Sequence, residues 1–276
     1  MLGKKNICFI GAGQMANAVV GGILRNGLVD ASNISMVDPH EGPRDYVRRT
    51  YKGIKTAPSP TNVLPLADIA VLAVKPNIAP QVMHSIKGLL KPKGVLVLSV
   101  MAGVTIDDLE EALDGNIHRI IRTMPNANVT VAAGCVGYAM GNNTDEIDEG
   151  IVRKIFDSLG VCAKVTEGQM AGITGLSGSG PAFVASFIEA LSDAGVKNGL
   201  PRDLAKTFAV NTVLGTAKLI QERDLSTLQV KEMVCSPGGT TIAGIEALEK
   251  NGLRYATMSA VTAAAEKSIL MSMKKL

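Results

Sequence analysis

Apolar residues follow two different patterns along this chain, and the pattern changes near residue 165. Before that point, short continuous apolar runs alternate with amphipathic stretches. Such alternation predicts strands joined by helices, and therefore a mostly parallel sheet covered on both faces. The predicted strands are 6–10, 34–37, 69–74, 95–100, 117–121, 136–140 and 162–165, and the predicted helices are 14–26, 78–90, 106–113 and 146–159.

After Glu167 the strand-like runs stop and only helical periods remain. The predicted helices are 181–198, 201–223, 225–234, 242–251 and 254–273. The last of them is rich in alanine around 260–265, so it needs closely packed partners, which a second subunit can supply. We therefore expect an α/β domain over 1–165 and an all-α domain over 166–276.

The composition argues against several functional classes. Of 276 residues, 46% are hydrophobic and 3% aromatic, which is ample for a core of aliphatic residues. The net charge of +3 comes without a basic block, so we expect no nucleic-acid partner. No run approaches about 18 uninterrupted apolar residues and no signal-peptide pattern opens the chain, so we expect no membrane span. Four dispersed cysteines without a CxxC pair predict reduced thiols in the cytoplasm.

A glycine-rich turn follows the first predicted strand. Gly11-Ala12-Gly13-Gln14-Met15-Ala16 fits the G-x-G-x-x-G/A dinucleotide fingerprint. Gly11 permits the tight turn, Gly13 admits the pyrophosphate to the backbone, and Ala16 lets the helix pack on its strand. Because the motif joins a strand to a helix and a second strand follows, it favours a bound dinucleotide in a Rossmann-type domain over a purely structural glycine turn.

The residues after the second strand bear on which dinucleotide binds. Asp38 ends that strand, where a carboxylate can bind both ribose hydroxyls and favour NAD. A loop-capping role is the alternative for Asp38. Arg44, Arg48 and Arg49 follow and could instead meet a 2′-phosphate, but we favour the solvated face of a short helix for them.

Two further strand ends are candidates for lining the nicotinamide ribose. Ala73-Val74-Lys75-Pro76 follows one strand, and Met101-Ala102-Gly103 follows the next. Ligands of open α/β sheets bind beyond the carboxyl ends of the strands, which is where both segments lie. For Lys75 alone, a surface lysine is the simpler explanation.

The helical half contains one stretch of bare backbone. Ser236-Pro237-Gly238-Gly239-Thr240-Thr241 lies between two predicted helices, and its N–H groups at a helix start suit a small anion. Taken alone, the stretch is better explained as an N-capped turn between helices. Paired with the glycine loop, it becomes the candidate cradle for a substrate carboxylate.

A general acid or base is hard to find. None of the three histidines, His40, His84 and His118, falls in the helical half, and that half has no evident catalytic lysine. The sequence shows no metal-ligand cluster, so we expect no metal site. Hydride addition to a C=N bond fits this pattern, because a protonated imine is already an electrophile and needs mainly positioning.

Together these motifs resemble those of the pyrroline-5-carboxylate reductase family along nearly the whole chain. The likeness rests on 9–16, 73–76, 102–106 and 122–126, and most specifically on 174–182 and 236–241. The resemblance implies a Rossmann domain and a helical dimerisation domain, with dimers that commonly assemble into decamers. It implies reduction of 1-pyrroline-5-carboxylate to L-proline, the last step of proline biosynthesis, by NADPH or NADH.

The resemblance also implies roles for individual residues. The Thr241 hydroxyl would hydrogen-bond the ring nitrogen as the catalytic contact, and Glu167 and Met233 would lie beside the substrate. The substrate carboxylate would meet the loop formed by Gly238, Gly239, Thr240 and Thr241. The implied cofactor contacts are Gly11, Ala12, Gly13, Gln14, Met15, Ala73, Val74, Lys75, Met101 and Ala102.

One position departs from the family pattern. The family usually carries a small polar residue after the second strand, which tolerates a 2′-phosphate, whereas this chain has Asp38. We therefore predict that NADH serves at least as well as NADPH, although His40 and Arg44 could compensate.

Two other functions stay open. One is a reductase of another cyclic imine or a β-hydroxyacid dehydrogenase-like enzyme, and residues 180–183 lack the lysine that the latter would want. The other is a non-enzymatic dinucleotide-binding regulator.

Overall fold

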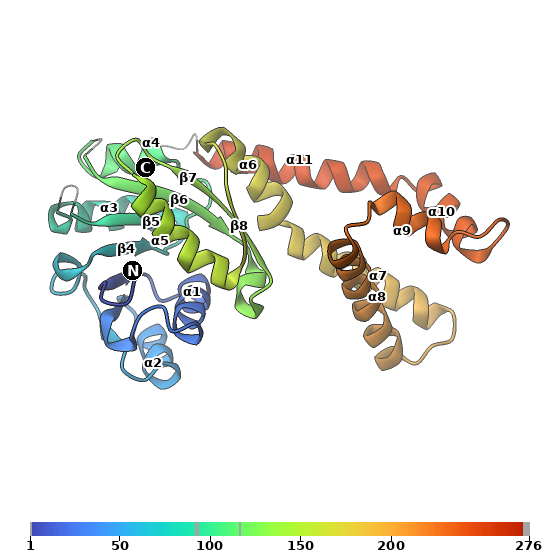
Figure 1. The fold of residues 1–276 in the computed structure, drawn as a ribbon, viewed down its shortest axis with the longest axis horizontal. Helices are drawn as coiled ribbons and strands as arrows, with labels where there is room; N and C mark the ends of the chain where they lie inside the picture. Colours follow the sequence, from blue (N-terminus) through green and yellow to red (C-terminus); the bar gives the residue numbers. More distant parts are fainter. Residues whose placement is uncertain (1, 92–93, 116, 273–276) are drawn as a thin grey trace. The chain divides into compact units, whose positions relative to one another are not determined.

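The structure is a computed structural model that describes residues 2–91, 94–115 and 117–272. The chain divides into two compact units (Figure 1). The first contains the described residues up to Ser179 together with those from Ala263 onward, and the second is Gly180–Thr262. This division differs from the expected boundary at 165, because Met170 is buried in the core of the first unit and a Cβ on Gly103 would lie 3.0 Å from Cβ of Met271.

A single sheet forms the centre of the first unit, with the strand order β3-β2-β1-β4-β5-β6-β7-β8. Its strands are β1 Ile7–Ile10, β2 Ile34–Val37, β3 Lys55–Ala57, β4 Ile69–Leu72, β5 Leu96–Ser99, β6 Arg119–Pro125, β7 Gly134–Met140 and β8 Gly160–Lys164. Neighbours are parallel except for β6 and β7. The predicted α/β class is confirmed.

Helices connect the strands and cover both faces of the sheet (Figure 1). They are α1 Gln14–Arg25, α2 Glu41–Thr50, α3 Ala79–Ile86, α4 Ile106–Ala112, α5 Glu146–Phe156 and α6 Met170–Ile173, with the π-helical turn η8 Thr174–Gly178. Short 3-10 turns are η1 Ala31–Asn33, η2 Leu64–Leu66, η3 Pro76–Ile78, η4 Lys87–Leu89, η5 Ala127–Val131, η6 Asp157–Leu159 and η7 Glu167–Gln169. Along β1, Ile7 and Phe9 join one core while Cys8 and Ile10 join the other, as the two-residue period of a strand requires.

The second unit is helical. It contains α7 Gly180–Lys197, α8 Arg202–Arg223, α9 Thr227–Val234, α10 Thr240–Lys250 and the first part of α11 Leu253–Ser272. The predicted helix over 254–273 agrees with α11 except at residue 273, which lies outside the described residues. Gly199 and Gly252 have φ of +94° and +73°, so the chain leaves the helices before them through a left-handed residue.

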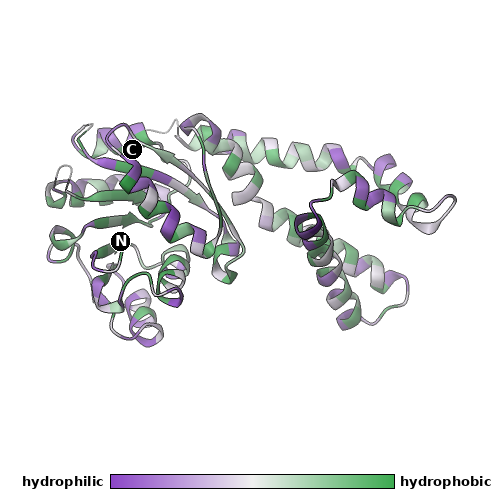
Figure 2. Ribbon diagram, in the orientation of Figure 1, coloured by the Kyte–Doolittle hydropathy of each residue, from purple (hydrophilic) through white to green (hydrophobic). Residues whose placement is uncertain are grey.

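Many large apolar side chains of these helices remain exposed. Examples are Val184, Phe187, Leu204, Phe208, Leu214, Leu248, Tyr255 and Met258. The ribbon coloured by hydropathy shows hydrophobic positions along the same helices (Figure 2). One helix of the described chain, Glu167–Lys197, is long and apolar enough by length and composition to cross a membrane. That finding qualifies the expectation of no membrane span, which rested on the lack of a long uninterrupted apolar run.

The sequence pattern missed β3 and misjudged β6. The strand predicted over 117–121 begins at Arg119 and continues to Pro125, because it pairs with β5 on one side and with β7 on the other. The segment 55–57 has no apolar run, and it forms a strand because it pairs with β2 at the sheet edge.

His118 gives the first unit a pH dependence that can be measured. It is buried just before β6, and desolvation lowers its pKa against the opposing effects of a hydrogen bond with the Leu113 backbone and the charge of Asp114. Because the folded state resists protonating this imidazole, the unfolded state takes up more protons below the ordinary histidine pKa of about 6.5. The free energy of unfolding should therefore fall as the pH drops through about 6.5. Urea unfolding at several pH values should show a smaller fall for His118→Leu, whereas His84→Leu, on the exposed side of α3, should behave like the wild type.

Candidate active site

The loops after four parallel strands meet at one edge of the sheet. The Gly11 N–H donates to the carbonyl of Val37 at 2.8 Å, and the Ala73 N–H donates to the carbonyl of Ile10 at 2.9 Å. The loop after β5 lies beside them, because β5 pairs with β4. The structure therefore brings together the predicted cofactor residues of the glycine loop, the end of β2 and the two later strand ends.

The two glycines of the first loop have different physical roles. Gly11 has φ of +102°, and a Cβ on it would lie 2.4 Å from the carbonyl oxygen of Ala73. Gly13, in contrast, has extended backbone, and a Cβ added to it would meet nothing within 4 Å. Gly11 is therefore required by the fold, while Gly13 leaves an open approach to the backbone.

The N-terminus of α1 is suited to a phosphate group. Gly13 is the N-cap and offers no side-chain cap, and the first turn carries no acidic residue. The helical ladder begins with the N–H of Asn17, which donates to the Gly13 carbonyl at 3.0 Å, so the earlier N–H groups of the turn point out of the helix. These residues fit the pyrophosphate of a dinucleotide at the positive end of the helix dipole.

The other predicted cofactor residues differ in exposure. Gln14 and Lys75 are exposed, Met15, Val74 and Ala102 are half-buried, and Ala12 is buried. Met101 is 1% exposed and packs in the core, so only its backbone is available for a ligand. Its N–H lies 3.3 Å from the Ser99 hydroxyl, which fixes the loop after β5.

Both oxygens of Asp38 are already engaged by backbone. Oδ2 accepts a hydrogen bond from the Ala12 N–H at 3.1 Å, and Oδ1 accepts one from the His40 N–H at 3.0 Å. The carboxylate therefore ties the glycine loop to the loop after β2. Since a carboxylate has about four acceptor sites, Asp38 can still receive further hydrogen bonds from a ribose.

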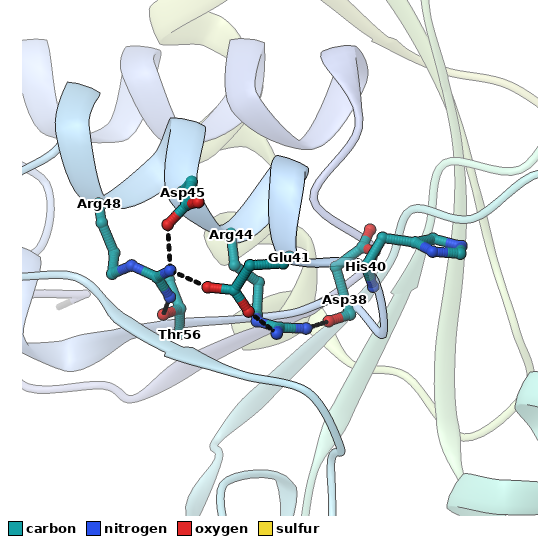
Figure 3. Close-up of polar contacts among 7 residues, drawn as sticks. All are labelled: Asp38, His40, Glu41, Arg44, Asp45, Arg48 and Thr56. Atoms are coloured by element: carbon teal, nitrogen blue, oxygen red, sulfur yellow. Dashed lines mark hydrogen bonds and ion pairs between the residues drawn. The ribbon is translucent and has the colours of Figure 1, made fainter.

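Of the three arginines after β2, Arg48 and Arg49 are exposed, as the interpretation favoured from the sequence expects, whereas the burial of Arg44 corrects it. Arg44 is 9% exposed and donates from Nη1 to the Asp38 carbonyl at 2.5 Å. Glu41 binds both Arg44 and Arg48, as Figure 3 shows. Arg48 also binds Asp45 and the Thr56 hydroxyl, whereas Arg49 is exposed. The sequence could not show this, because the burial of Arg44 depends on how α2 packs beside β2.

The loop 236–241 is a turn and also an open helix start. Pro237 and Gly238 occupy its centre, Gly238 has φ of +64°, and the Gly239 N–H donates to the Ser236 carbonyl at 3.1 Å. These features describe a type II turn, in which the glycine position requires positive φ. A Cβ on Gly239 would lie 2.3 Å from Oγ of Ser236, so a larger residue there would require the serine hydroxyl to rotate away.

Helix α10 begins directly after this turn without a side-chain cap. Gly239 is its N-cap, its first turn has no acidic residue, and the ladder starts only with the N–H of Ala243. A pocket beside it is lined by Gly238, Gly239, Ile242, Ala243, Ile245 and Glu246. Thr241 is half-buried at the second helical position, Thr240 is exposed, and Met233 is exposed in α9.

Comparison with known proteins identifies the family. The chain is 39% identical over 259 residues to a pyrroline-5-carboxylate reductase of Synechocystis, a match that covers 94% of this chain and 95% of the relative. It is 39% identical over 269 residues to the Escherichia coli protein of that name, with 98% and 99% covered. The chain belongs to the pyrroline-5-carboxylate reductase family.

Two domain families and a solved structure agree with this membership. Residues 167–271 match the family described as pyrroline-5-carboxylate reductase dimerisation, and residues 6–103 match that described as NADP oxidoreductase, coenzyme F420-dependent. The crystal structure of the Plasmodium falciparum pyrroline carboxylate reductase with NADP bound superposes with a TM-score of 0.89 at 35% identity. That match covers 99% of this chain and all of the other.

One polar contact of this pyrroline-5-carboxylate reductase family member was missed by sequence reasoning. Arg122, 4% exposed on β6, forms an ion pair with Glu167 at the start of η7. Sequence reasoning gave Glu167 a site role but no partner. An arginine within an apolar strand was the available signal, because a buried guanidinium requires an anionic or carbonyl partner.

Proposed function

We propose that this chain reduces 1-pyrroline-5-carboxylate to L-proline by hydride transfer from NADPH or NADH, the last step of proline biosynthesis. The observation that carries the proposal is the uncapped start of α10 behind the Gly238–Gly239 turn. It offers free N–H groups and the positive end of a helix dipole to a carboxylate. Membership of the family and the open α1 N-terminus support it.

The proposed chemistry divides the work between anion binding and positioning. The N–H groups of Thr240 and Thr241 at the start of α10 hold the substrate carboxylate, and the Thr241 hydroxyl hydrogen-bonds the ring nitrogen. When bound, a nicotinamide would supply the hydride for the new C–H bond at the C=N carbon, and the π pair would move to nitrogen. Because the iminium is already electrophilic, fixed polar groups can supply most of the catalysis without a histidine or lysine.

The remaining site residues have supporting roles in this proposal. Gly13, Gln14 and Met15 would hold the pyrophosphate through their backbone N–H groups, while Gly11 and Ala12, whose N–H groups bond to Val37 and Asp38, would shape the loop around it. The backbone of 73–75 and of Met101 and Ala102 lines the nicotinamide ribose. Glu167, fixed by Arg122, and Met233 lie on the substrate side.

The alternatives have less support. A β-hydroxyacid dehydrogenase-like mechanism would want a lysine early in α7, and that helix has none before Lys197 in its last turn. A non-enzymatic regulator would not need the open start of α10. A reductase of another cyclic imine would share both loops and differ in the substrate.

The direct test is oxidation of NADH, followed at about 340 nm, on adding 1-pyrroline-5-carboxylate to the purified protein. The matched substrate 1-pyrroline has the same C=N bond and no carboxylate. We expect kcat/KM for 1-pyrroline to be at least about a hundredfold lower, since charge-assisted hydrogen bonds to the carboxylate are lost. No turnover of either imine would refute the proposed function. Equal turnover of the two imines would indicate a reductase that does not bind the substrate carboxylate at the start of α10.

The preference between cofactors is a separate prediction. A 2′-phosphate would approach Asp38, whose carboxylate is held in place by the Ala12 and His40 N–H groups and cannot swing away freely. We therefore expect kcat/KM for NADH to equal or exceed that for NADPH. Steady-state kinetics with both cofactors measures this, and a value for NADPH more than tenfold above that for NADH would contradict it.

We further propose a homodimer, with a decamer of five dimers as its assembly, in the cytoplasm. The exposed apolar side chains of α7, α8 and α11 and the match to a dimerisation family support a subunit partner. The same match includes Glu167–Lys197, which favours protein rather than lipid as the cover of that helix. The free thiols of Cys8, Cys135, Cys162 and Cys235 are consistent with a reducing compartment. Light scattering on the purified protein gives the subunit number directly.

A further inference from the structure

The bonded network after β2 contains more acids than bases. Asp38, Glu41 and Asp45 supply three carboxylates, and Arg44 and Arg48 supply two guanidinium groups. Figure 3 shows the Glu41 carboxylate between the two arginines, with one oxygen toward each. Hydrogen bonds from Arg48 and then Arg44 lower the pKa of Glu41, so its carboxylate stays charged.

This arrangement limits how Arg44 and Arg48 can bind a 2′-phosphate. An arginine near the end of the second strand is what accommodates the 2′-phosphate in NADP-binding Rossmann domains. Here Nη2 of Arg44 is bound by Glu41 and its Nη1 by the Asp38 carbonyl. Arg48 meets Glu41, Asp45 and Thr56. Glu41 therefore occupies one donor on Nη2 of each guanidinium and offsets its positive charge, which weakens what either arginine can offer a phosphate.

We propose that Glu41 is a specificity-determining residue of this reductase: by pairing with Arg44 and Arg48 together, it withholds both from a 2′-phosphate. Asp38 then faces the ribose. Because Glu41 pairs with Arg44 and Arg48, their positive charge is not available to offset the repulsion between Asp38 and a phosphate dianion. The inference rests on the proposed function only in that a nicotinamide dinucleotide binds with its adenosine ribose at the end of β2.

The chain offers a matched control for the test. Glu41→Gln and Asp45→Asn each remove one negative charge from α2. Only the first frees Arg44, because Arg44 pairs with Glu41 and Asp45 pairs with Arg48. When Asp45 is neutralised, both arginines keep their bonds to Glu41. The Glu41 side chain is 60% exposed, so its amide should fit without repacking. Comparing the two variants separates release of the arginines from a general change of charge.

The probes are adenosine 5′-monophosphate and adenosine 2′,5′-bisphosphate, which differ only in the 2′-phosphate. Isothermal titration calorimetry measures their binding without any turnover. For Glu41→Gln we expect the affinity for the bisphosphate to rise at least tenfold, with that for the monophosphate changed less than threefold. For Asp45→Asn both should change less than threefold. The kcat/KM ratio of NADPH to NADH should rise in parallel for Glu41→Gln alone.

Several outcomes would overturn the inference. An equal gain in both variants would show that net charge alone matters, and no gain in Glu41→Gln would show that the released arginines do not reach the phosphate. Thermal melting checks that each variant is folded, and Glu41→Ser gives a second way to release the arginines. If the nucleotides bind as expected while no imine is reduced, the proposed reaction fails and the inference stands. If neither nucleotide nor NADH binds, both fail.

Discussion

Replacing Gly11 with alanine is expected to lower the free energy of unfolding by about 3 kcal/mol or more. Its φ of +102° disfavours any L side chain, and the new Cβ would lie 2.4 Å from the Ala73 carbonyl oxygen. The Ala73 carbonyl is part of the backbone of the loop after β4, so it cannot rotate away as a side chain could. In thermal melts, we expect Gly11→Ala to lower the midpoint by roughly 6–12 °C.

Gly13→Ala is the matched control, because it makes the same chemical change two residues later. Its φ of −74° suits alanine, and the added Cβ meets nothing within 4 Å. We expect its melting temperature to stay within about 2 °C of wild type, since an exposed substitution without strain changes stability little. The affinity for NADH should nevertheless fall at least about tenfold, because the Cβ enters the approach of the pyrophosphate. A Gly11→Ala protein that melts like wild type would contradict the close approach to Ala73.

Local patterns predicted most of the first unit because each strand and helix carries its own period. The runs at 6–10 and 34–37 alternate with amphipathic stretches, and β1, α1 and β2 lie where those patterns predict. The strand β3 escaped prediction because three residues at a sheet edge are defined by pairing with β2, not by their own sequence. The reversal between β6 and β7 is likewise a property of the pairing.

Candidate site residues could be proposed from the sequence where the backbone itself would be the functional group. A glycine at a strand end or helix start leaves a signal in the sequence, as Gly11, Gly13 and Gly238 do. Partnerships between distant side chains leave none. The Ala12–Asp38 bond and the Arg122–Glu167 ion pair join residues 26 and 45 positions apart, so they depend on the assembled sheet.

Replacing Thr241 with alanine is expected to reduce kcat/KM for 1-pyrroline-5-carboxylate by roughly ten- to a thousandfold. The proposed role of its hydroxyl is to position the ring nitrogen, and losing one positioned hydrogen bond costs rates in that range. Gly239 already serves as the N-cap of α10, and its helix has no side-chain cap to lose. The melting temperature should therefore change little, so a loss of rate can be assigned to the missing hydroxyl.

Two further substitutions at this position separate chemistry from shape. Thr241→Val keeps the branched shape without the hydroxyl and should lose as much activity as alanine. Thr241→Ser keeps the hydroxyl and should retain most of the rate. Because the carboxylate would still be bound by the backbone N–H groups of the α10 start, KM should change less than kcat. If all three variants match the wild type, Thr241 is a residue of the helix start alone, and the substrate nitrogen is positioned by another group.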